Sequence, residues 1–170
     1  MASIDGRPIR KEQILALVEQ RLGTDLQLLR NLENQHDREI GRDLHTRTRQ
    51  ETGKIDLQTL TGVAAFQQAL LLRFLTRAGE MSLLGHPNYG SRLHELIGEL
   101  NTASNRNRAK LFILQSLADE PRIEKVVAIS VTQNVSDPNR IDIDLTLKSL
   151  TFDTPFNLVF PFFLEPGVTP

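Results

Sequence analysis

The chain has 170 residues, which is enough for one domain with a buried core. Its 20 basic and 21 acidic side chains leave a net charge of -1, so no overall field attracts nucleic acid or an anionic membrane surface. The sequence has no cysteine, which excludes disulfides, thiolate metal sites and a cysteine nucleophile. It also lacks a secretion signal and any apolar run near the roughly 20 residues of a membrane span, so we expect a cytoplasmic chain without membrane insertion.

Residues 10–38 carry a helical period. Four apolar side chains follow an a/d-type spacing, namely Leu15, Val18, Leu22 and Leu29. Gly23 suits the end of one helix and Thr24 the cap of the next, so we predict two short helices or one kinked helix. The stripe fits either packing onto the protein's own core or docking against partner helices. We treat 1–38 as a helical docking segment and 39–170 as the main α+β domain.

The next segment, residues 42–60, predicts a β-hairpin. A short polar alternation and the sequence "IDLQTL" flank Glu51-Thr52-Gly53-Lys54, which has the composition of a turn. Arginines at 42, 47 and 49 suggest a nucleic-acid surface, but no aromatic residue lies among them to stack on bases. We therefore expect a solvated hairpin that binds no nucleic acid.

The middle of the chain predicts three helices. The first spans Gly62 to Arg77, and its apolar face consists of Val63, Phe66, Leu70 and Phe74. Arg73 lies late in this helix, where a cation suits the terminal carbonyl groups. A short helix is predicted from Ser91 to Ile97, and another from about Thr102 to Ala118. The apolar side of the last helix carries Ala109, Phe112 and Ile113.

The period changes to two in the C-terminal part, which predicts an antiparallel or mixed sheet. Val127, Ile129 and Val131 alternate with small or polar residues, and a second alternation runs from Ile141 to Leu147. A last apolar strand, "FNLVFPFFL", contains Pro161, which has no N–H to donate and therefore belongs at a sheet edge. The fold class is α+β, with N-terminal helices, a short hairpin, a helical middle and a C-terminal sheet open to strand addition.

The loop "GEMSLLGHPNYGS" between the helices contains groups that enzymes use. A glycosidase needs two carboxyl groups, one with a raised pKa, and Glu80 with Glu95 or Glu99 could supply them. The chain has no tryptophan and one tyrosine, so it lacks an aromatic platform for sugars. His86 and His94 do not have the spacing of a zinc protease, and we expect neither a metal nor a cofactor.

The composition of the same loop favours a structural role over a catalytic one. Gly79 suits the end of the preceding helix, Pro87 stiffens the turn, and Gly90 permits close approach of another segment. Tyr89 can bury its ring while its hydroxyl group finds a partner. We expect these residues, with Glu80, to form a structural loop that has no chemistry of its own.

Four stretches together resemble the baseplate wedge family of contractile tails. They are Gly62, "AFQQALLLRFLTRAGE" (65–80), "HPNYGSRLHELIG" (86–98) and "EPRI" (120–123). The family includes the W-type baseplate protein of contractile-tailed phages and the matching subunits of type VI secretion and extracellular contractile injection systems. The resemblance covers residues 40–164, and it is specific because the stretches occur in this order at these distances.

The resemblance implies a small α+β structural protein with six copies per baseplate, assembled in the cytoplasm and incorporated in the tail particle. Such a protein links the core bundle of the other wedge subunits to the first ring of sheath protein and templates sheath assembly. It catalyses no reaction. Hub, spike or tube proteins are further candidate partners. Glu120, Pro121 and Arg122 correspond to the motif through which the family contacts the core bundle.

The last strand suggests how sheath protein would bind. A strand added at the sheet edge by a neighbouring subunit would bury its apolar side chains, namely Phe156, Leu158, Phe160 and Phe162. Burial of a phenylalanine contributes about 2 kcal/mol, more than the ~1 kcal/mol of a backbone hydrogen bond. We expect alanine at both 120 and 122 to leave the fold intact but to block incorporation into baseplates. Truncation after Asp153 is expected to prevent sheath nucleation.

Two other functions remain open from the sequence. One is a peptidoglycan-cleaving glycosidase that uses Glu80 with Glu95 or Glu99. The other is a helical adaptor that binds a single partner through residues 10–38.

Overall fold

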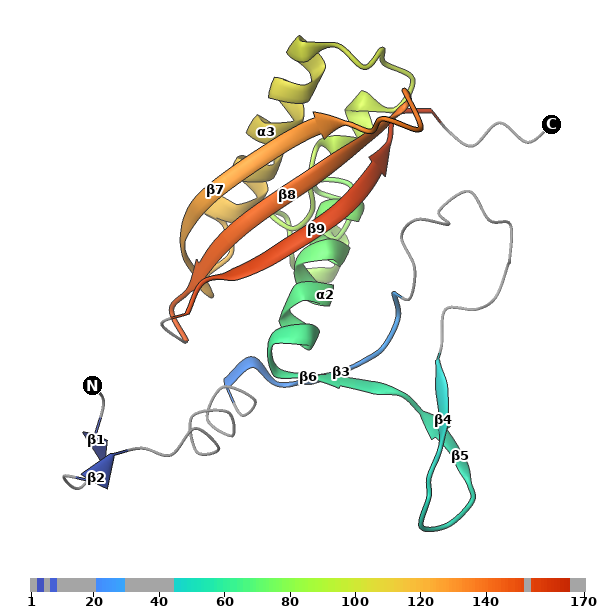
Figure 1. Ribbon diagram of the computed structural model, residues 1–170, viewed down its shortest axis with the longest axis vertical. Coiled ribbons are helices and arrows are strands. Elements are labelled where there is room, and N and C mark those ends of the chain that lie inside the picture. The colour runs from blue at the N-terminus through green and yellow to red at the C-terminus, as the bar shows by residue number, and fades with distance from the viewer. Residues whose placement is uncertain (1–2, 5–6, 9–20, 30–44, 152–153, 166–170) are drawn as a thin grey trace. The chain divides into compact units, whose positions relative to one another are not determined.

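The computed structural model describes residues 3–4, 7–8, 21–29, 45–151 and 154–165 (Figure 1). These residues fall into two compact units, one that ends at Gln68 and one that begins at Ala69. The division falls within helix α2 (Gly62–Leu75), which continues into the second unit. The predicted division at residue 38 lies outside the described residues and stays a prediction.

The first unit contains short antiparallel strand pairs. The pairs are β1 (Ser3–Ile4) with β2 (Arg7–Pro8), β3 (Thr24–Leu26) with β6 (Thr59–Thr61), and β4 (Thr46–Thr48) with β5 (Ile55–Leu57). Threonine recurs in these strands, and its branched side chain suits extended backbone better than helix.

The helical period predicts a helix through residues 24–29, but residues 24–26 form strand β3 and residues 27–29 are not helical. Gly23 adopts a φ of 81°, a left-handed conformation that ends the helical turn before it. Its carbonyl group accepts the N–H of Gly62 at 3.0 Å, which directs the following residues alongside β6.

The side-chain amide of Gln68, which is buried, fixes the chain after β3. Its Oε1 accepts the N–H of Leu28 at 2.8 Å, and its Nε2 donates to the carbonyl group of Leu26 at 2.7 Å. Both contacts join residues that are far apart in the sequence. The helix prediction fails here because such long-range contacts outweigh a local period.

The predicted hairpin is confirmed as β4 and β5. The N–H of Arg49 donates to the carbonyl group of Lys54 at 2.9 Å, and the N–H of Gly53 donates to that of Arg49 at 2.8 Å. Gly53 has a φ of 66°, which the turn requires. Arg49 forms an ion pair with Asp56 across the hairpin, so part of its positive charge is neutralised within the strands.

The second unit contains the end of α2, a long loop and a second helix. The loop carries two short 3₁₀ helices, η2 (Ser82–Leu84) and η3 (Leu93–Leu96), and is followed by α3 (Ala103–Ala118). The hydroxyl group of Thr102 accepts the N–H of Asn105 at 3.2 Å and thereby caps α3. The predictions for α2 and α3 are confirmed. The buried side of α3 includes the predicted residues Ala109, Phe112 and Ile113.

The C-terminal strands form an antiparallel sheet in the order β7 (Ile123–Gln133), β8 (Arg140–Ser149) and β9 (Phe156–Phe163). Figure 1 shows α3 and, from the second unit, the end of α2 against one face of this sheet. The ring of Phe74 on α2 stacks on that of Phe160 on β9, with centroids 5.4 Å apart. The α+β fold class is therefore confirmed, and Pro161 lies on an edge strand of the described sheet as predicted.

Strand β7 departs from the predicted alternation. Val127 belongs to the same alternation as Ile129 and Val131, which predicts one shared face, but its side chain is 50% exposed. The register against β8 shifts between Val126 and Ala128, which marks a β-bulge. Val126 therefore pairs with Leu147 and takes the place of Val127 on the core face of the sheet.

Candidate functional site

The loop after α2 folds back onto the end of that helix. The N–H of Ser91 donates to the carbonyl group of Thr76 at 2.8 Å, and the N–H of Ala78 donates to that of Ser91 at 3.0 Å. Gly90 has a φ of 106°, and a Cβ there would lie 2.4 Å from the carbonyl oxygen of Arg77. Only glycine fits without a backbone shift, so the close approach predicted for Gly90 is present.

The other residues of the predicted structural loop also have defined positions. Gly79 has a φ of 78° shortly after the end of α2. The carboxylate of Glu80 accepts the N–H of Arg77 at 3.2 Å. Tyr89 is half-buried, while Pro87 is exposed. These contacts give the loop a fixed shape.

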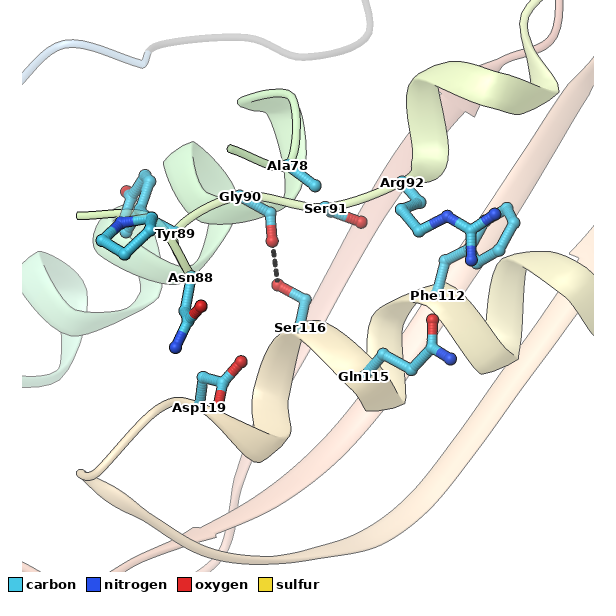
Figure 2. A pocket seen from close by; sticks show the side chains of 11 residues that line it. Ala78, Asn88, Tyr89, Gly90, Ser91, Arg92, Phe112, Gln115, Ser116 and Asp119 are labelled. Atoms are coloured by element: carbon cyan, nitrogen blue, oxygen red, sulfur yellow. Dashed lines mark hydrogen bonds between the residues drawn. The ribbon is translucent and has the colours of Figure 1, made fainter. Parts of the chain in front are cut away.

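A pocket of about 230 Å³ lies between this loop and the C-terminal half of α3 (Figure 2). The hydroxyl group of Ser116 on α3 donates to the carbonyl group of Gly90 at 2.9 Å and ties the two walls together. At one end, the guanidinium group of Arg92 lies 4.7 Å from the ring centroid of Phe112. The remaining walls consist of Ala78, Pro87, Asn88, Tyr89, Ser91, Gln115 and Asp119.

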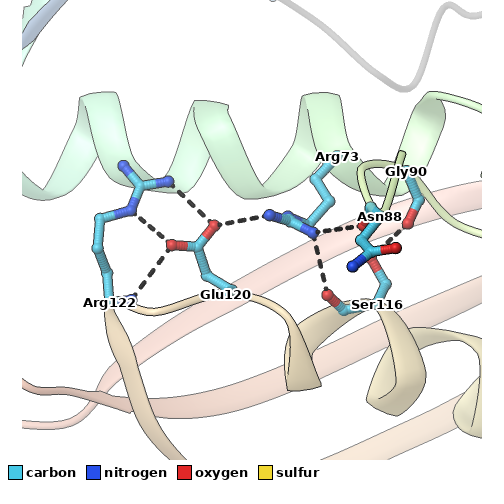
Figure 3. A network of polar contacts seen from close by, with 6 residues as sticks. All are labelled: Arg73, Asn88, Gly90, Ser116, Glu120 and Arg122. Atoms are coloured by element: carbon cyan, nitrogen blue, oxygen red, sulfur yellow. Dashed lines mark hydrogen bonds and ion pairs between the residues drawn. The ribbon is translucent and has the colours of Figure 1, made fainter. Parts of the chain in front are cut away.

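A buried ion-pair network adjoins the pocket and is centred on Glu120 (Figure 3). Glu120 follows the end of α3, and its carboxylate accepts hydrogen bonds from the side chain of Arg122 at 2.7 and 3.1 Å. The backbone N–H of Arg122 donates to the same carboxylate at 3.3 Å. Pro121 between them is exposed.

Arg73 of α2 supplies the second cation of this network. Its Nη2 lies 3.4 Å from Oε2 of Glu120, and the side chain is only 8% exposed. Its Nη1 donates to the carbonyl groups of Ser116 at 3.3 Å and Asn88 at 3.5 Å. The guanidinium carbon lies 4.8 Å from the ring centroid of Tyr89. Arg73 thus joins α2, the loop and α3.

The network sets the ionisation of its acidic groups. Burial alone would raise the pKa of Glu120, but the hydrogen bonds and charge of Arg122, together with the charge of Arg73, outweigh it and hold that pKa below its ordinary value. Burial raises the pKa of the Tyr89 hydroxyl group. Glu120 is therefore a carboxylate at neutral pH and acts as a buried anchor.

The predicted docking role of Glu120 needs correction. Its side chain is 4% exposed and its oxygens are already bonded to Arg122 and Arg73, so it cannot also bind a partner without losing these contacts. Arg73 differs from its prediction too, since it neutralises a carboxylate and does not cap helix carbonyls from solvent. Arg122, at 38% exposure, and Pro121 remain accessible.

The predicted partner-binding side chains of β9 also need correction, because the chain buries them itself. Phe156, Leu158, Phe160 and Phe162 are 9%, 5%, 1% and 6% exposed. They pair with the core-facing residues of β8, namely Leu147, Leu145, Ile143 and Ile141. A partner cannot bury what is already buried. Truncation after Asp153 would therefore remove part of the core.

The predicted N-terminal docking stripe is only partly described. Leu15 and Val18 lie outside the described residues. Leu22 is 8% exposed, so within the described chain it is a core residue and offers no docking surface. Leu29 is half-buried, and its N–H donates to Oε1 of Gln68 at 3.1 Å.

The glutamates considered as catalytic acids lie outside the pocket, and one of them is bound by an arginine. Two hydrogen bonds from Arg92, at 2.6 and 2.9 Å, hold the pKa of Glu95 below its usual value. Glu80 and Glu99 are exposed, and none of the three lines the pocket. A glycosidase acid needs a raised pKa, which requires burial or a neighbouring like charge.

Sequence reasoning did not identify Arg73 and Ser116 as residues that join the loop to the helices. One signal was available, because Arg73 adjoins Phe74 in the most apolar part of α2, where a cation needs a buried partner. The described residues contain no group of three His, Asp or Glu that could hold a metal ion. None of the helices in the described part of the chain could cross a membrane.

No protein-family model matches this sequence, and no curated protein matches it. Among solved structures, a protein from Geobacter sulfurreducens described as a "putative tail lysozyme" has a similar fold. The TM-score is 0.53 at 20% sequence identity, and the similarity covers 62% of this chain and 94% of that chain. At this identity the similarity concerns the fold.

Proposed function

We propose that this chain is a structural component of a contractile tail or injection particle, where it links the baseplate wedge to the first ring of sheath protein and templates sheath assembly. The observation that carries the proposal is the sheet, in which the apolar strand β9 pairs with β8 and forms an edge of the described sheet. The fold similarity to a protein described as a tail lysozyme supports a tail-associated role. The stretches that resemble the baseplate wedge family support the finer assignment.

Strand addition at β9 is the proposed mode of binding. The side chains of Phe160 and Phe162 anchor the strand in the core, so its backbone is already ordered when a partner arrives. Preorganisation lowers the entropic cost of pairing, and an added strand from the sheath subunit would bond to the backbone of Leu158–Phe162. The phenylalanines thus contribute rigidity, and the affinity comes from backbone hydrogen bonds and exposed neighbours.

Val159 is the clearest exposed neighbour. It is 58% exposed and lies opposite Asp144 on the face of the sheet that carries polar residues. Pro161 limits the N–H groups that an added strand can use and so restricts its register. These features favour one ordered partner over general strand aggregation.

The wedge side of the protein is proposed to include the turn at Pro121 and Arg122. The network of Glu120 and Arg73 fixes this turn from inside, which gives the exposed residues a constant geometry. Six copies per baseplate, with wedge, sheath and possible hub, spike or tube neighbours, form part of the proposal. Assembly in the cytoplasm and incorporation into the particle belong to it as well.

A site-specific cross-link tests the strand addition. A photoreactive amino acid placed at Val159 in intact particles is expected to link this chain to the sheath subunit. The same group at Val127, which is 50% exposed on β7 at the opposite edge, serves as the matched control. Particles that contain the protein but yield a sheath cross-link only from position 127 would contradict the assignment to β9.

The proposed structural role includes no catalytic activity. The second candidate function is a peptidoglycan-cleaving glycosidase. The name of the similar structure is the observation that favours it. The low pKa of Glu95 and the exposure of Glu80 count against it. Purified protein is expected not to clear a suspension of peptidoglycan. Clearing that disappears in both Glu80→Gln and Glu95→Gln would replace the structural proposal with the enzymatic one.

A further inference from the structure

We infer that the pocket between the loop and α3 receives an arginine side chain of a neighbouring protein subunit. This rests on the proposed function, because it names the chemistry by which the chain holds a partner at a second place, away from β9. The pocket adjoins the buried network, and the carbonyl groups of Asn88 and Ser116 in its lining accept hydrogen bonds from Arg73.

Three polar side chains of the pocket are exposed and have no protein partner among the described residues. Asn88 on the loop, Gln115 on α3 and Asp119 just after α3 all line it, and none of these side chains has a hydrogen bond or ion pair with the described residues. In Figure 2 the side chains of Asn88 and Asp119 point toward the same end of the pocket. Their oxygens are acceptors, and a ligand with several donors would satisfy them together.

The charge of the pocket favours a cation. Arg92, the one basic residue among its walls, already forms a two-point ion pair with Glu95. Arg73, which lies close by, is paired with Glu120, a carboxylate that it shares with Arg122. Asp119 is the acidic residue of the lining and has no counter-ion among the described residues. It lies at the C-terminal end of the 16-residue helix α3, which adds a partial negative charge.

The size and chemistry of the pocket select arginine among cations. A volume of about 230 Å³ is smaller than the roughly 300–1,000 Å³ of small-molecule sites and suits one side chain. A guanidinium group presents five donors in a plane, which can reach a carboxylate and neighbouring amide oxygens at once. The ammonium group of lysine is a point charge with three donors, so it would satisfy fewer of these acceptors.

The walls of the pocket are stiff enough to recognise one side chain. Ser116 and Gly90 tie α3 to the loop at 2.9 Å, and Gly90 is held against the carbonyl group of Arg77. The backbone carbonyl group of Asn88 accepts a hydrogen bond from Arg73 at 3.5 Å. A preformed pocket loses little conformational entropy on binding, which is the usual property of an interface anchor site.

The test is a titration of the isotope-labelled full chain with N-acetyl-arginine amide, followed by NMR. Saturable shifts are expected in the backbone amide of Asp119 and the side-chain amides of Asn88 and Gln115, with a Kd on the order of millimolar for a single residue. Asp119→Asn, which keeps the shape of the side chain, is expected to weaken binding roughly tenfold. Asp144→Asn, an equally conservative change at an exposed position of β8, is the matched control and should bind as the wild type does.

Two further probes fix the chemical identity of the occupant. N-acetyl-citrulline amide has the same shape without the charge and is expected to cause no saturable shift, while N-acetyl-lysine amide should bind more weakly than the arginine probe. Equal binding of citrulline or lysine, equal affinity in Asp119→Asn, or no saturable shift with arginine would each overturn the inference.

The outcome is separable from that of the proposed function. If purified tail particles contain the chain and its sheath cross-link at Val159, but the arginine probe does not bind, the inference fails and the proposed function stands. If the probe binds as expected and the particles lack the chain, the proposed function fails, and the arginine site must serve another assembly.

Discussion

The guanidinium group of Arg73 lies 3.4 Å from the carboxylate of Glu120, and both side chains are more than nine-tenths buried. This ion pair connects α2 to the segment that follows α3. The stretch that resembles a docking motif is thus fixed from inside the molecule. Because the two charges are removed from water, the loss of either one leaves the other uncompensated.

Replacement of Arg73 by methionine is expected to lower the free energy of unfolding by about 3 kcal/mol. The methionine fills similar space, but among the described residues Glu120 then keeps only Arg122 as a counter-ion. Urea unfolding at neutral pH measures the change. Arg77→Met, which changes an exposed arginine close to the end of α2, is the control and should cost less than about 0.5 kcal/mol. Equal losses in the two variants would show that the ion pair does not contribute.

The stabilisation from Glu120 should depend on pH. Its pKa is lower in the folded chain than in the unfolded chain, so its contribution is complete above the unfolded value of about 4.3 and is lost as the pH falls through the folded value. Glu120→Gln is therefore expected to be less stable than the wild type at pH 7, and the difference should shrink in acid. Urea unfolding of both proteins across this range measures it, and a difference that is independent of pH would contradict the assignment.

Phe160→Ala is expected to destabilise the fold by about 3–5 kcal/mol, because its ring is 1% exposed and stacks on Phe74. Val159→Ala on the same strand should cost less than about 1 kcal/mol, since that side chain is 58% exposed. Thermal unfolding of the two variants measures the contrast. Similar losses would mean that β9 does not present alternating faces to core and solvent.

Gly90→Ala should be far more damaging than Gly98→Ala, although both glycines have positive φ values, of 106° and 92°. An alanine Cβ at 98 meets nothing within 4 Å, so only the strain of about 1–2 kcal/mol applies. At 90 the same atom would lie 2.4 Å from the carbonyl oxygen of Arg77 and would force the loop off α2. Free energies of unfolding from urea titrations compare the two, and the prediction is wrong if the losses are equal.

The hairpin, the helices α2 and α3 and strand β8 could be predicted from the sequence because each depends on a local signal. The composition of residues 51–54 suits a turn, and the residues of β8 alternate between core and solvent over its whole length. Such periods are fixed by the geometry of the backbone, so they need no knowledge of distant residues. The structural role of Gly90 was also predictable, because only glycine allows another backbone segment to approach so closely.

The sequence by itself determined the elements that carry a clear local period, such as α2, α3 and β8, whereas the tertiary structure decided which groups remain available to a partner. Burial of Glu120 depends on Arg73, and burial of the β9 phenylalanines depends on α2 and β8; both involve residues that are distant in the chain. The same holds for β3, which is extended because Gly23 and Gln68 hold it beside β6. Charge and apolar character are properties of a residue, but exposure is a property of its neighbours, and neighbours exist only in the folded chain.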